Sequence, residues 1–325
     1  MDFTILLEIK KPNLSEASKR SYISGWKAIK RILKIPADDH NLEFLKNVEN
    51  VIDTIYTESK QNINTTKFKI AIVLEALKMS NEPLYREEIT KYKEYMDMLR
   101  AKSEQTTSEH KMTEKQAQKW VSADEKDKIL EYLKSNLSTK KILTQEQLLN
   151  YRNYLLYVLQ TDTATRNDLA YSILMYRPTS EKKYKALPTT ENYIILNKKD
   201  KSVEYVRNVF KTAKTHGQTI IPIKSELYAD LDKYMKGLKL YSPEVEGGYW
   251  LFMNEDCKSR MTANRLGVVY AGLGQLAGLD KKLSTTVNRH QKASENFEAV
   301  KKIQENAKQM GHSVAMNLAY CVEGC

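Results

Sequence analysis

The sequence predicts a mainly α-helical protein with a small antiparallel β-sheet, organised in two domains. Apolar residues recur at helical spacing along most of the 325 residues, whereas β-type runs are confined to residues 192–223. A polar stretch at residues 102–115, rich in Ser, Thr and charge, interrupts the helical pattern and is typical of a connection between domains. Hydrophobic residues make up 41% of the chain, enough to fill two packed cores.

The N-terminal domain is expected to span residues 1–105 and to be entirely helical. Its clearest helix covers residues 15–34, with Ser15 as the expected N-cap and Ser18 as the alternative. We expect Pro36 to end this helix, because proline cannot continue one. The apolar stripe of the helix consists of Tyr22, Trp26, Ile29 and Leu33. Further helices are expected over about 41–59, 63–79 and 84–101.

A linker at residues 106–118 is expected to lead into the second domain, residues 119–325. Helices are expected from near Ala123 and over about 145–160. Three β-type runs then favour a three-stranded antiparallel sheet, at residues 192–196, 202–212 and 218–223. Helical patterns return over about 224–238, 261–277, 293–309 and 313–321.

The chain carries a surplus of positive charge. Lys and Arg number 52 against 41 acidic residues, which gives a formal net charge of +11. Residues 1–110 hold 18 basic and 17 acidic side chains, so residues 111–325 hold the remaining 34 and 24. A surplus of this size suits a polyanionic partner, either nucleic acid or an anionic membrane surface, and most of it belongs to the second domain.

Several classes of protein are disfavoured by composition. No apolar run reaches the ~18 residues that cross a bilayer, and the apolar stretch at the N-terminus is too short for a signal peptide. The three cysteines, Cys257, Cys321 and Cys325, form no CxxC pair, which argues against a disulfide framework or a zinc site. The five histidines are too scattered for a metal motif. We therefore expect no metal site, and an intracellular, reducing compartment.

Four short segments combine basic, hydroxyl and imidazole side chains. They cover residues 161–169, 211–222, 286–290 and 310–320. In this order and spacing they resemble the catalytic boxes of the tyrosine recombinase (phage integrase) family. Residues 15–26 also resemble the family's helical core-binding domain, so that the resemblance extends over most of the chain.

The resemblance assigns the central residues one by one. Arg166 is similar to the first family arginine, which follows a TGLR-like turn. Lys214 lies eight residues before Pro222, as the family's hairpin lysine does, and Lys211 competes with it for this role. Arg289 and its neighbour His290 are similar to the Arg-His of the family's HxxRH box.

The last segment matches two further family positions. Residues 311–313, Gly-His-Ser, resemble the LGHS box, which makes His312 a candidate for proton transfer. Tyr320 is similar to the family nucleophile. Arg289 and His312 are 23 residues apart, a separation that is typical of the family.

The family chemistry suits these residue types. Two arginines can each direct a planar set of donors at the non-bridging oxygens of a phosphodiester, where negative charge grows during transfer. A tyrosine has an ordinary pKa of ~10 and attacks well only in an electropositive site or beside a base. A lysine on a hairpin can protonate the departing 5′ oxygen. The 3′-phosphotyrosyl link conserves the bond energy, so that strand exchange needs neither metal nor ATP.

The chain departs from the family pattern at three places. Thr286 stands where the family has the first histidine of the HxxRH box, although its hydroxyl can still donate to phosphate. Asp168 lies one residue nearer to Arg166 than the usual family acid. The interval from His312 to Tyr320 is one residue shorter than in the family. Thr286 and Asp168 remain secondary site candidates, together with His290 and Lys211.

Each candidate also has a structural explanation when taken alone. Arg166 fits a solvated arginine after a helix, Lys214 an ordinary turn lysine, and His312 a neighbour of a glycine helix end. Tyr320 is one of 20 tyrosines and would alone be assigned to packing. The basic side of residues 15–34 is by default a solvated helix face. The joint order and spacing of the segments favours the catalytic interpretation.

The resemblance implies a site-specific DNA recombinase or integrase, built as a two-domain clamp on duplex DNA and acting as a homotetramer on two DNA sites. Integration or excision of a viral or mobile element is the expected use. The resemblance also implies that no cofactor is needed and that the protein works where it has access to DNA, in the cytoplasm of a prokaryotic host or the nucleus of a eukaryotic host. The residues expected to contact DNA are Lys19, Arg20, Lys27, Lys30, Arg31, Lys67 and Lys69. Three alternatives remain open at this point: a type IB topoisomerase-like enzyme, a catalytically impaired DNA-binding relative, and a helical scaffold unrelated to DNA.

Overall fold

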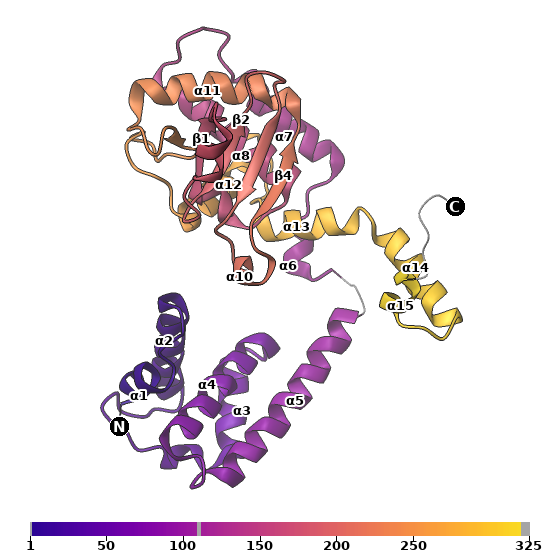
Figure 1. The fold of residues 1–325 in the computed structure, drawn as a ribbon. Helices are drawn as coiled ribbons and strands as arrows, with labels where there is room; N and C mark the ends of the chain where they lie inside the picture. Colours follow the sequence, from indigo (N-terminus) through magenta and orange to yellow (C-terminus); the bar gives the residue numbers. More distant parts are fainter. Residues whose placement is uncertain (1, 109–111, 320–325) are drawn as a thin grey trace. The chain divides into compact units, whose positions relative to one another are not determined.

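Helices dominate both parts of the chain in the computed structural model, which describes residues 2–108 and 112–319 (Figure 1). The chain divides into two units, residues 1–112 and 113–325, and each is considered by itself. None of the helices in the described ranges has the length and apolar character that crossing a bilayer requires.

Unit 1 is a helical domain around one apolar core. Its α-helices are α1 (Phe3–Lys10), α2 (Glu16–Ile32), α3 (Val48–Glu58), α4 (Ile63–Asn81) and α5 (Arg86–Ser108), with a 3-10 turn η1 (Glu43–Leu45). Fully buried side chains that hold the helices together include Ile29, Ile55, Ile70 and Leu77. The ring of Trp26 stacks on Phe3 with centroids 4.9 Å apart, which attaches α1 to α2.

The two ends of α2 test the local predictions. Ser15 is the N-cap, and its side chain accepts a hydrogen bond from the backbone N–H of Ser18. The helix ends at Ile32, earlier than expected from Pro36, because Lys34 already adopts a left-handed backbone with φ of 57°. Residues 102–108 also differ from the expected irregular connection, since α5 continues through them to Ser108.

The helices of unit 2 begin at well-formed N-caps. Ser122 and Thr144 each form a capping box, which starts α7 (Ala123–Ser135) and α8 (Gln145–Thr163). The other helices longer than one turn are α11 (Tyr228–Tyr241), α12 (Ala263–Leu276), α13 (Thr285–Ser294), α14 (Phe297–Gln309) and α15 (Val314–Ala319). Short helical turns are α6 (Glu114–Ala117), α9 (Glu181–Lys185), α10 (Ala213–His216), η2 (Asn167–Tyr171) and η3 (Ser225–Leu227).

The sheet is mixed, and the expectation of a purely antiparallel sheet is wrong. Its five strands have the order β4-β3-β2-β1-β5. Their bounds are β1 (Ser172–Tyr176), β2 (Asn192–Leu196), β3 (Val203–Arg207), β4 (Thr219–Ile223) and β5 (Tyr249–Trp250). The expected antiparallel pairs β2–β3 and β3–β4 are present, whereas β1 pairs parallel with β2 and antiparallel with β5. The expected strand over residues 202–212 already ends at Arg207.

Alternate residues of the strands belong to two different apolar clusters. Leu174, Ile194 and Tyr205 pack with buried residues of α8, α11 and α12, and form the main core. Their neighbours Ile173 and Tyr193 face a smaller cluster on the other side of the sheet. Because both faces of β1 and β2 are buried, the middle of the sheet is a rigid base for the segments that leave these strands.

A single buried amide ties three of these segments together. The side chain of Asn192, 0% exposed at the start of β2, donates to the carbonyl oxygens of Asp168 (3.1 Å) and Val209 (3.0 Å). Its oxygen accepts from the N–H groups of Asn208 (2.8 Å) and Val209 (2.7 Å). Two donated and two accepted hydrogen bonds satisfy the whole amide, which therefore fixes η2 to the segment after β3.

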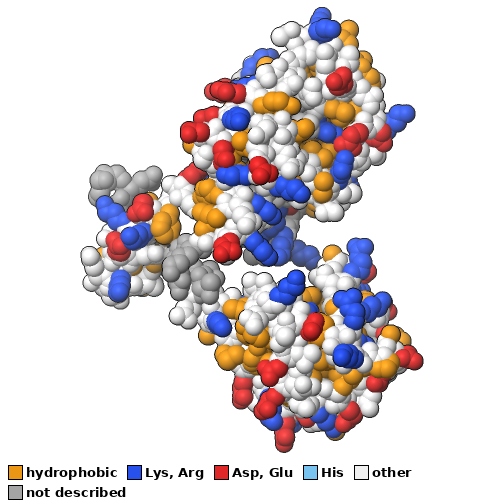
Figure 2. All heavy atoms as spheres, turned by 180° about the vertical axis from the view of Figure 1, so that it is seen from behind, with side chains coloured by type: hydrophobic (Ala, Val, Ile, Leu, Met, Phe, Trp, Pro, Cys, Tyr) orange, Lys and Arg blue, Asp and Glu red, His pale blue; other side chains and the backbone are white. Residues whose placement is uncertain are grey.

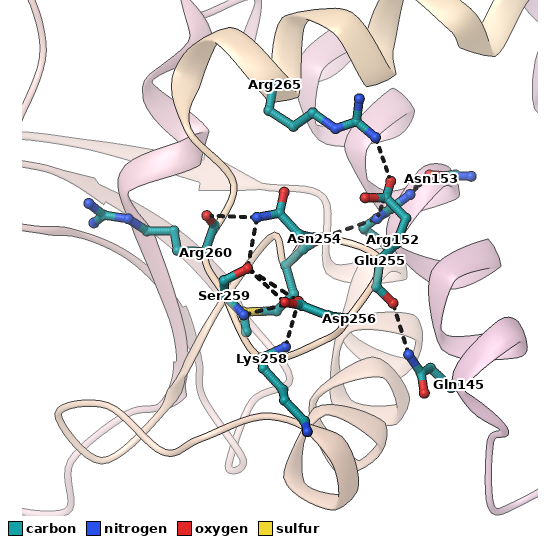
Figure 3. A network of polar contacts seen from close by, with 11 residues as sticks. Gln145, Arg152, Asn153, Asn254, Glu255, Asp256, Lys258, Ser259, Arg260 and Arg265 are labelled. Carbon is teal, nitrogen blue, oxygen red and sulfur yellow. Dashed lines mark hydrogen bonds and ion pairs between the residues drawn. The ribbon is translucent and has the colours of Figure 1, made fainter.

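The segment between β5 and α12 is held by a polar network (Figure 3). Arg152 of α8, 5% exposed, donates to the carbonyl oxygen of Met253 at 3.1 Å. Glu255 accepts from Arg265 of α12 at 2.9 Å, so that the loop is attached to both helices. Asn167 of η2 donates in turn to the carbonyl of Ala263, at 2.9 Å. The start of η2 is thereby fixed to α12 on one side and to β2 on the other.

We predict that Asn192→Ala lowers the free energy of unfolding by about 3 kcal/mol, because it leaves buried backbone donors and acceptors without partners. Denaturant titration of the whole chain measures the loss. Asn197→Ala, at the other end of the same strand, is the matched control and should cost about 1 kcal/mol or less. Equal losses in the two variants would contradict the role given to Asn192.

Candidate active site

The turn after α8 positions Arg166. Ala164 has φ of 45° and ψ of 31°, a left-handed conformation, and its N–H donates to the Gln160 carbonyl at 3.0 Å. The Gln160 side chain donates to the carbonyl of Thr165, which holds the reversed chain against the end of α8. The exposed side chain of Arg166 follows immediately, at the N-terminal end of η2.

Arg289 is carried by α13, a helix that the sequence patterns did not predict as a separate element. Ser284 caps the helix by accepting from the N–H of Val287. The buried Asn288 donates to the Gln160 carbonyl at 2.7 Å, and the buried Gln291 donates to the carbonyl of Val121. The two bonds fix the helix on either side of Arg289, and the bond from Asn288 attaches it to the end of α8, where the turn that carries Arg166 begins.

The two arginines, 123 positions apart in the sequence, line one open pocket with a volume of about 480 Å³. Hydroxyl and imidazole groups contribute to its wall together with the arginines. The lining residues are Thr163, Ala164, Thr165, Arg166, Arg207, Phe210, Thr212, His216, Thr219, Ile221 and Arg289. This combination of guanidinium and hydroxyl donors suits an oxyanion, and phosphate in particular.

Two like charges, those of Arg166 and Arg289, line the same pocket. Burial and, next, the positive charge of Arg166 lower the pKa of the Arg289 guanidinium, while Asp168 acts in the opposite direction. Arginine remains protonated under all ordinary conditions. Burial is the larger cause of the lowered pKa and the charge of Arg166 the smaller one, and an anion bound beside both arginines would offset both effects.

A third arginine in the wall was not predicted from the sequence. Arg207, the last residue of β3, pairs with Asp168 at 2.8 Å, and the two side chains are only 14% and 9% exposed. Asp168, a secondary candidate, thus lies at the site through this ion pair. The signal for Arg207 is weak in the sequence, because a charged residue at the end of a β-type run usually faces solvent.

The candidate lysines lie close to the pocket along the chain but do not line it. Lys214 belongs to α10, the one-turn helix between β3 and β4, and its side chain is exposed. Lys211 is exposed in the segment just before it. The pocket wall instead takes Thr212 and His216 from this part of the chain.

The remaining candidates occupy α13 and the end of the chain. Thr286 and His290 are exposed on α13, the former one turn before Arg289. His312 follows a left-handed Gly311 after α14, and its N–H donates to the carbonyl of Ala307 at 2.8 Å. His312 is not among the described residues that line the pocket. Tyr320 lies outside the described residues.

One expected DNA contact in unit 1 is wrong. Lys30 is 5% exposed, and its ammonium group donates to the backbone carbonyls of Ala37 and Asp39 while lying over the Trp26 ring. Lys30 closes the turn after α2 and is therefore not available to DNA. The helical pattern of the sequence could not reveal that the chain folds back over this side chain.

The other expected contacts differ in their surroundings. Arg20, Lys27 and Arg31 of α2 are exposed. Lys19 is half-buried and pairs with Glu16 at 3.1 Å. On α4, Lys67 is half-buried, and Lys69 donates to the Ser59 hydroxyl at 2.9 Å, with burial lowering its pKa. The face in Figure 2 shows acidic and basic side chains interspersed over much of both units.

The described residues contain no cluster of three or more His, Cys, Asp or Glu side chains that could hold a metal ion. Cys257 is buried with a free thiol. What the pocket offers is positive charge and hydroxyl donors, and these can bind an anion and stabilise charge that develops on it.

Comparison with known proteins gives little further information. No protein-family model matches the chain, and no curated protein does. A solved structure, the crystal structure of XerA recombinase, is similar with a TM-score of 0.36 and 13% sequence identity. The similarity covers 99% of this chain and 92% of that one.

We predict that Ala164→Gly raises the free energy of unfolding by about 0.5–1 kcal/mol, because glycine adopts the left-handed conformation without the steric cost of a Cβ. Thermal and denaturant unfolding measure the change. Ala186→Gly provides the control, since this exposed alanine ends α9 with φ of −90° and the substitution there should be destabilising. A loss of stability in Ala164→Gly would show that the left-handed conformation of Ala164 carries no steric cost.

Replacing one of the two facing cations should have opposite effects on stability and on binding. We predict that Arg166→Gln stabilises the ligand-free protein by about 0.5 kcal/mol, because repulsion with Arg289 is lost at a largely solvated position. The same variant should lose most of the rise in unfolding temperature that millimolar phosphate gives the native chain. An undiminished rise would show that phosphate binds elsewhere.

Proposed function

We propose that this chain cleaves and rejoins DNA strands as a tyrosine recombinase, with Tyr320 as the nucleophile. The observation that carries the proposal is the meeting of Arg166 and Arg289 in one pocket. Their sequence motifs are far apart in the chain, and the fold brings both into one pocket wall. Two arginines with nearby threonine hydroxyls are suited to grip the non-bridging oxygens of one phosphodiester.

The proposed reaction is a transesterification. The Tyr320 oxygen attacks the phosphorus, the bond from phosphorus to the 5′ oxygen breaks, and a 3′-phosphotyrosyl link forms. Arg166 and Arg289 stabilise the second negative charge that appears on the pentavalent phosphate. Attack by the 5′ hydroxyl of another strand reverses the step and restores a diester. The same number of ester bonds exists before and after, so that no ATP is consumed.

Proton transfer is assigned to the residues near the pocket. Lys214 would deliver a proton to the departing 5′ oxygen, with Lys211 as its competitor on the same segment. His312 would accept the proton of Tyr320. Thr286 would add a hydroxyl donor to the phosphate, in place of the family histidine. These roles require Lys214 and His312, which do not line the described pocket, to approach it when DNA is bound.

Duplex DNA is the proposed partner, held as in a clamp by the two units. Exposed cations of α2, namely Arg20, Lys27 and Arg31, would contact phosphates, which makes binding strongly dependent on salt. Joining of two DNA sites by a homotetramer, for integration or excision of a viral or mobile element, completes the proposal.

A DNA-binding relative without catalysis is the second candidate. It is favoured by Thr286 in place of a histidine and by the positions of Lys214 and His312 outside the described pocket wall. Such a protein would keep the phosphate grip of Arg166 and Arg289 without forming a covalent link. A type IB topoisomerase-like enzyme would form the link but would act as a monomer on a single duplex.

We predict that the chain forms a denaturation-resistant adduct with a nicked suicide duplex from the ends of its own element, because loss of the short 5′ fragment traps the phosphotyrosyl link. Tyr320→Phe should abolish the adduct, a loss of at least about 10³-fold, since phenylalanine has no nucleophile. Labelled DNA on denaturing gels measures it.

Tyr132→Phe is the matched control, because Tyr132 is an exposed tyrosine of α7. It should form as much adduct as the native chain. DNA binding without an adduct on a proven target would leave the non-catalytic relative as the function. An adduct that persists in Tyr320→Phe would assign the nucleophile to another residue.

A further inference from the structure

The pair formed by Arg207 and Asp168 is unusually well fixed for a charged pair beside an open pocket. The guanidinium of Arg207 lies 4.3 Å from the centre of the Phe210 ring and 5.9 Å from that of Tyr205. Burial raises the pKa of Tyr205, so that this phenol stays neutral. The Asp168 backbone is held separately, through its carbonyl, by Asn192. Both members of the ion pair are therefore held in place by contacts besides the pair itself.

Asp168 is the acid that acts on two arginines at once. It pairs directly with Arg207 at 2.8 Å, and its charge also reaches Arg289. A carboxylate that turned fully to Arg289 would occupy the donors that face the pocket and cancel their charge. The arginine pair would then be closed to an external anion, although every residue of the motif would still be present.

We propose that Arg207 is a positioning residue, which holds the Asp168 carboxylate away from Arg289 and so keeps Arg166 and Arg289 open for one phosphate. The inference rests on the proposed phosphate site but not on cleavage of DNA. Three arginines line the pocket in the described part of the chain, and Arg207 with Asp168 forms a neutral pair. The charge that remains is that of Arg166 and Arg289, which matches the double negative charge of a pentavalent phosphate.

The proposal makes opposite predictions for the two members of the pair. Arg207→Gln releases a buried carboxylate beside Arg289, and we expect inorganic phosphate to bind about tenfold more weakly. Asp168→Asn removes the competing charge, and phosphate should bind as tightly as to the native chain or more tightly. The double variant lacks both charges and should bind phosphate within about threefold of the native chain.

The experiment is titration calorimetry of inorganic phosphate into the full chain and the three variants at low ionic strength, with near-ultraviolet circular dichroism to check folding. Arg177→Gln is the matched control. Arg177 directly follows β1, pairs with Glu204 at 3.2 Å and lies 4.0 Å from the Tyr184 ring, but it does not line the pocket. Its replacement should leave phosphate binding unchanged.

Two results would overturn the proposal. Weak binding that persists in the double variant would mean that Arg207 itself contacts the anion. Weak binding in Asp168→Asn would mean that the ion pair has only a structural role, and this variant decides the matter even if Arg207→Gln does not fold. A native chain that binds no phosphate would remove this inference, whereas the proposed function would still be decided by the DNA adduct. Phosphate binding with the expected pattern, but without a DNA adduct, would remove only the proposed function.

Discussion

The hydrogen-bonded amide of Asn192 is the constraint on which the pocket depends. It connects η2, which begins beside Arg166, with the segment that follows Arg207, and it does so from a strand buried on both faces. A carboxylate at this position would lack the two donors, and a shorter side chain would reach neither segment. Two walls of the pocket that are about 40 residues apart in sequence are thus kept at a fixed separation by a neutral group.

The fold places like charges together and then prevents their neutralisation. The charge of Arg166 acts against that of Arg289, and Asp168, whose charge favours Arg289, is engaged by Arg207. Stability alone would favour the opposite arrangement, with Asp168 between the two motif arginines. Such a conflict between stability and charge placement is typical of sites that bind a ligand of opposite charge. Here the three arginines are held by three different elements: Arg166 by η2, Arg207 by β3 and Arg289 by α13.

Local signals in the sequence predicted the local structure. Ser15 and the periodic apolar residues gave α2, and the hairpin pattern gave β2, β3 and β4. The strand β1 was missed, because SILMY is a continuous apolar run without alternation. Lys30 was misassigned and Arg207 was missed for a common reason: their surroundings are built by distant segments. Motif spacing selected Arg166 and Arg289, but it could not show that Lys214 and His312 lie off the described wall.

The positive charges of Arg166 and Arg289 also determine how the protein responds to the ions in its solvent. A pocket with two facing cations and hydroxyl donors attracts any small oxyanion around it, including sulfate and the phosphate of common buffers. Such ions would compete with a DNA phosphate for the same donors, in addition to the general screening that chloride provides. The choice of buffer anion is therefore a variable of the site itself, and equal ionic strengths of chloride and sulfate are not equivalent conditions for this protein.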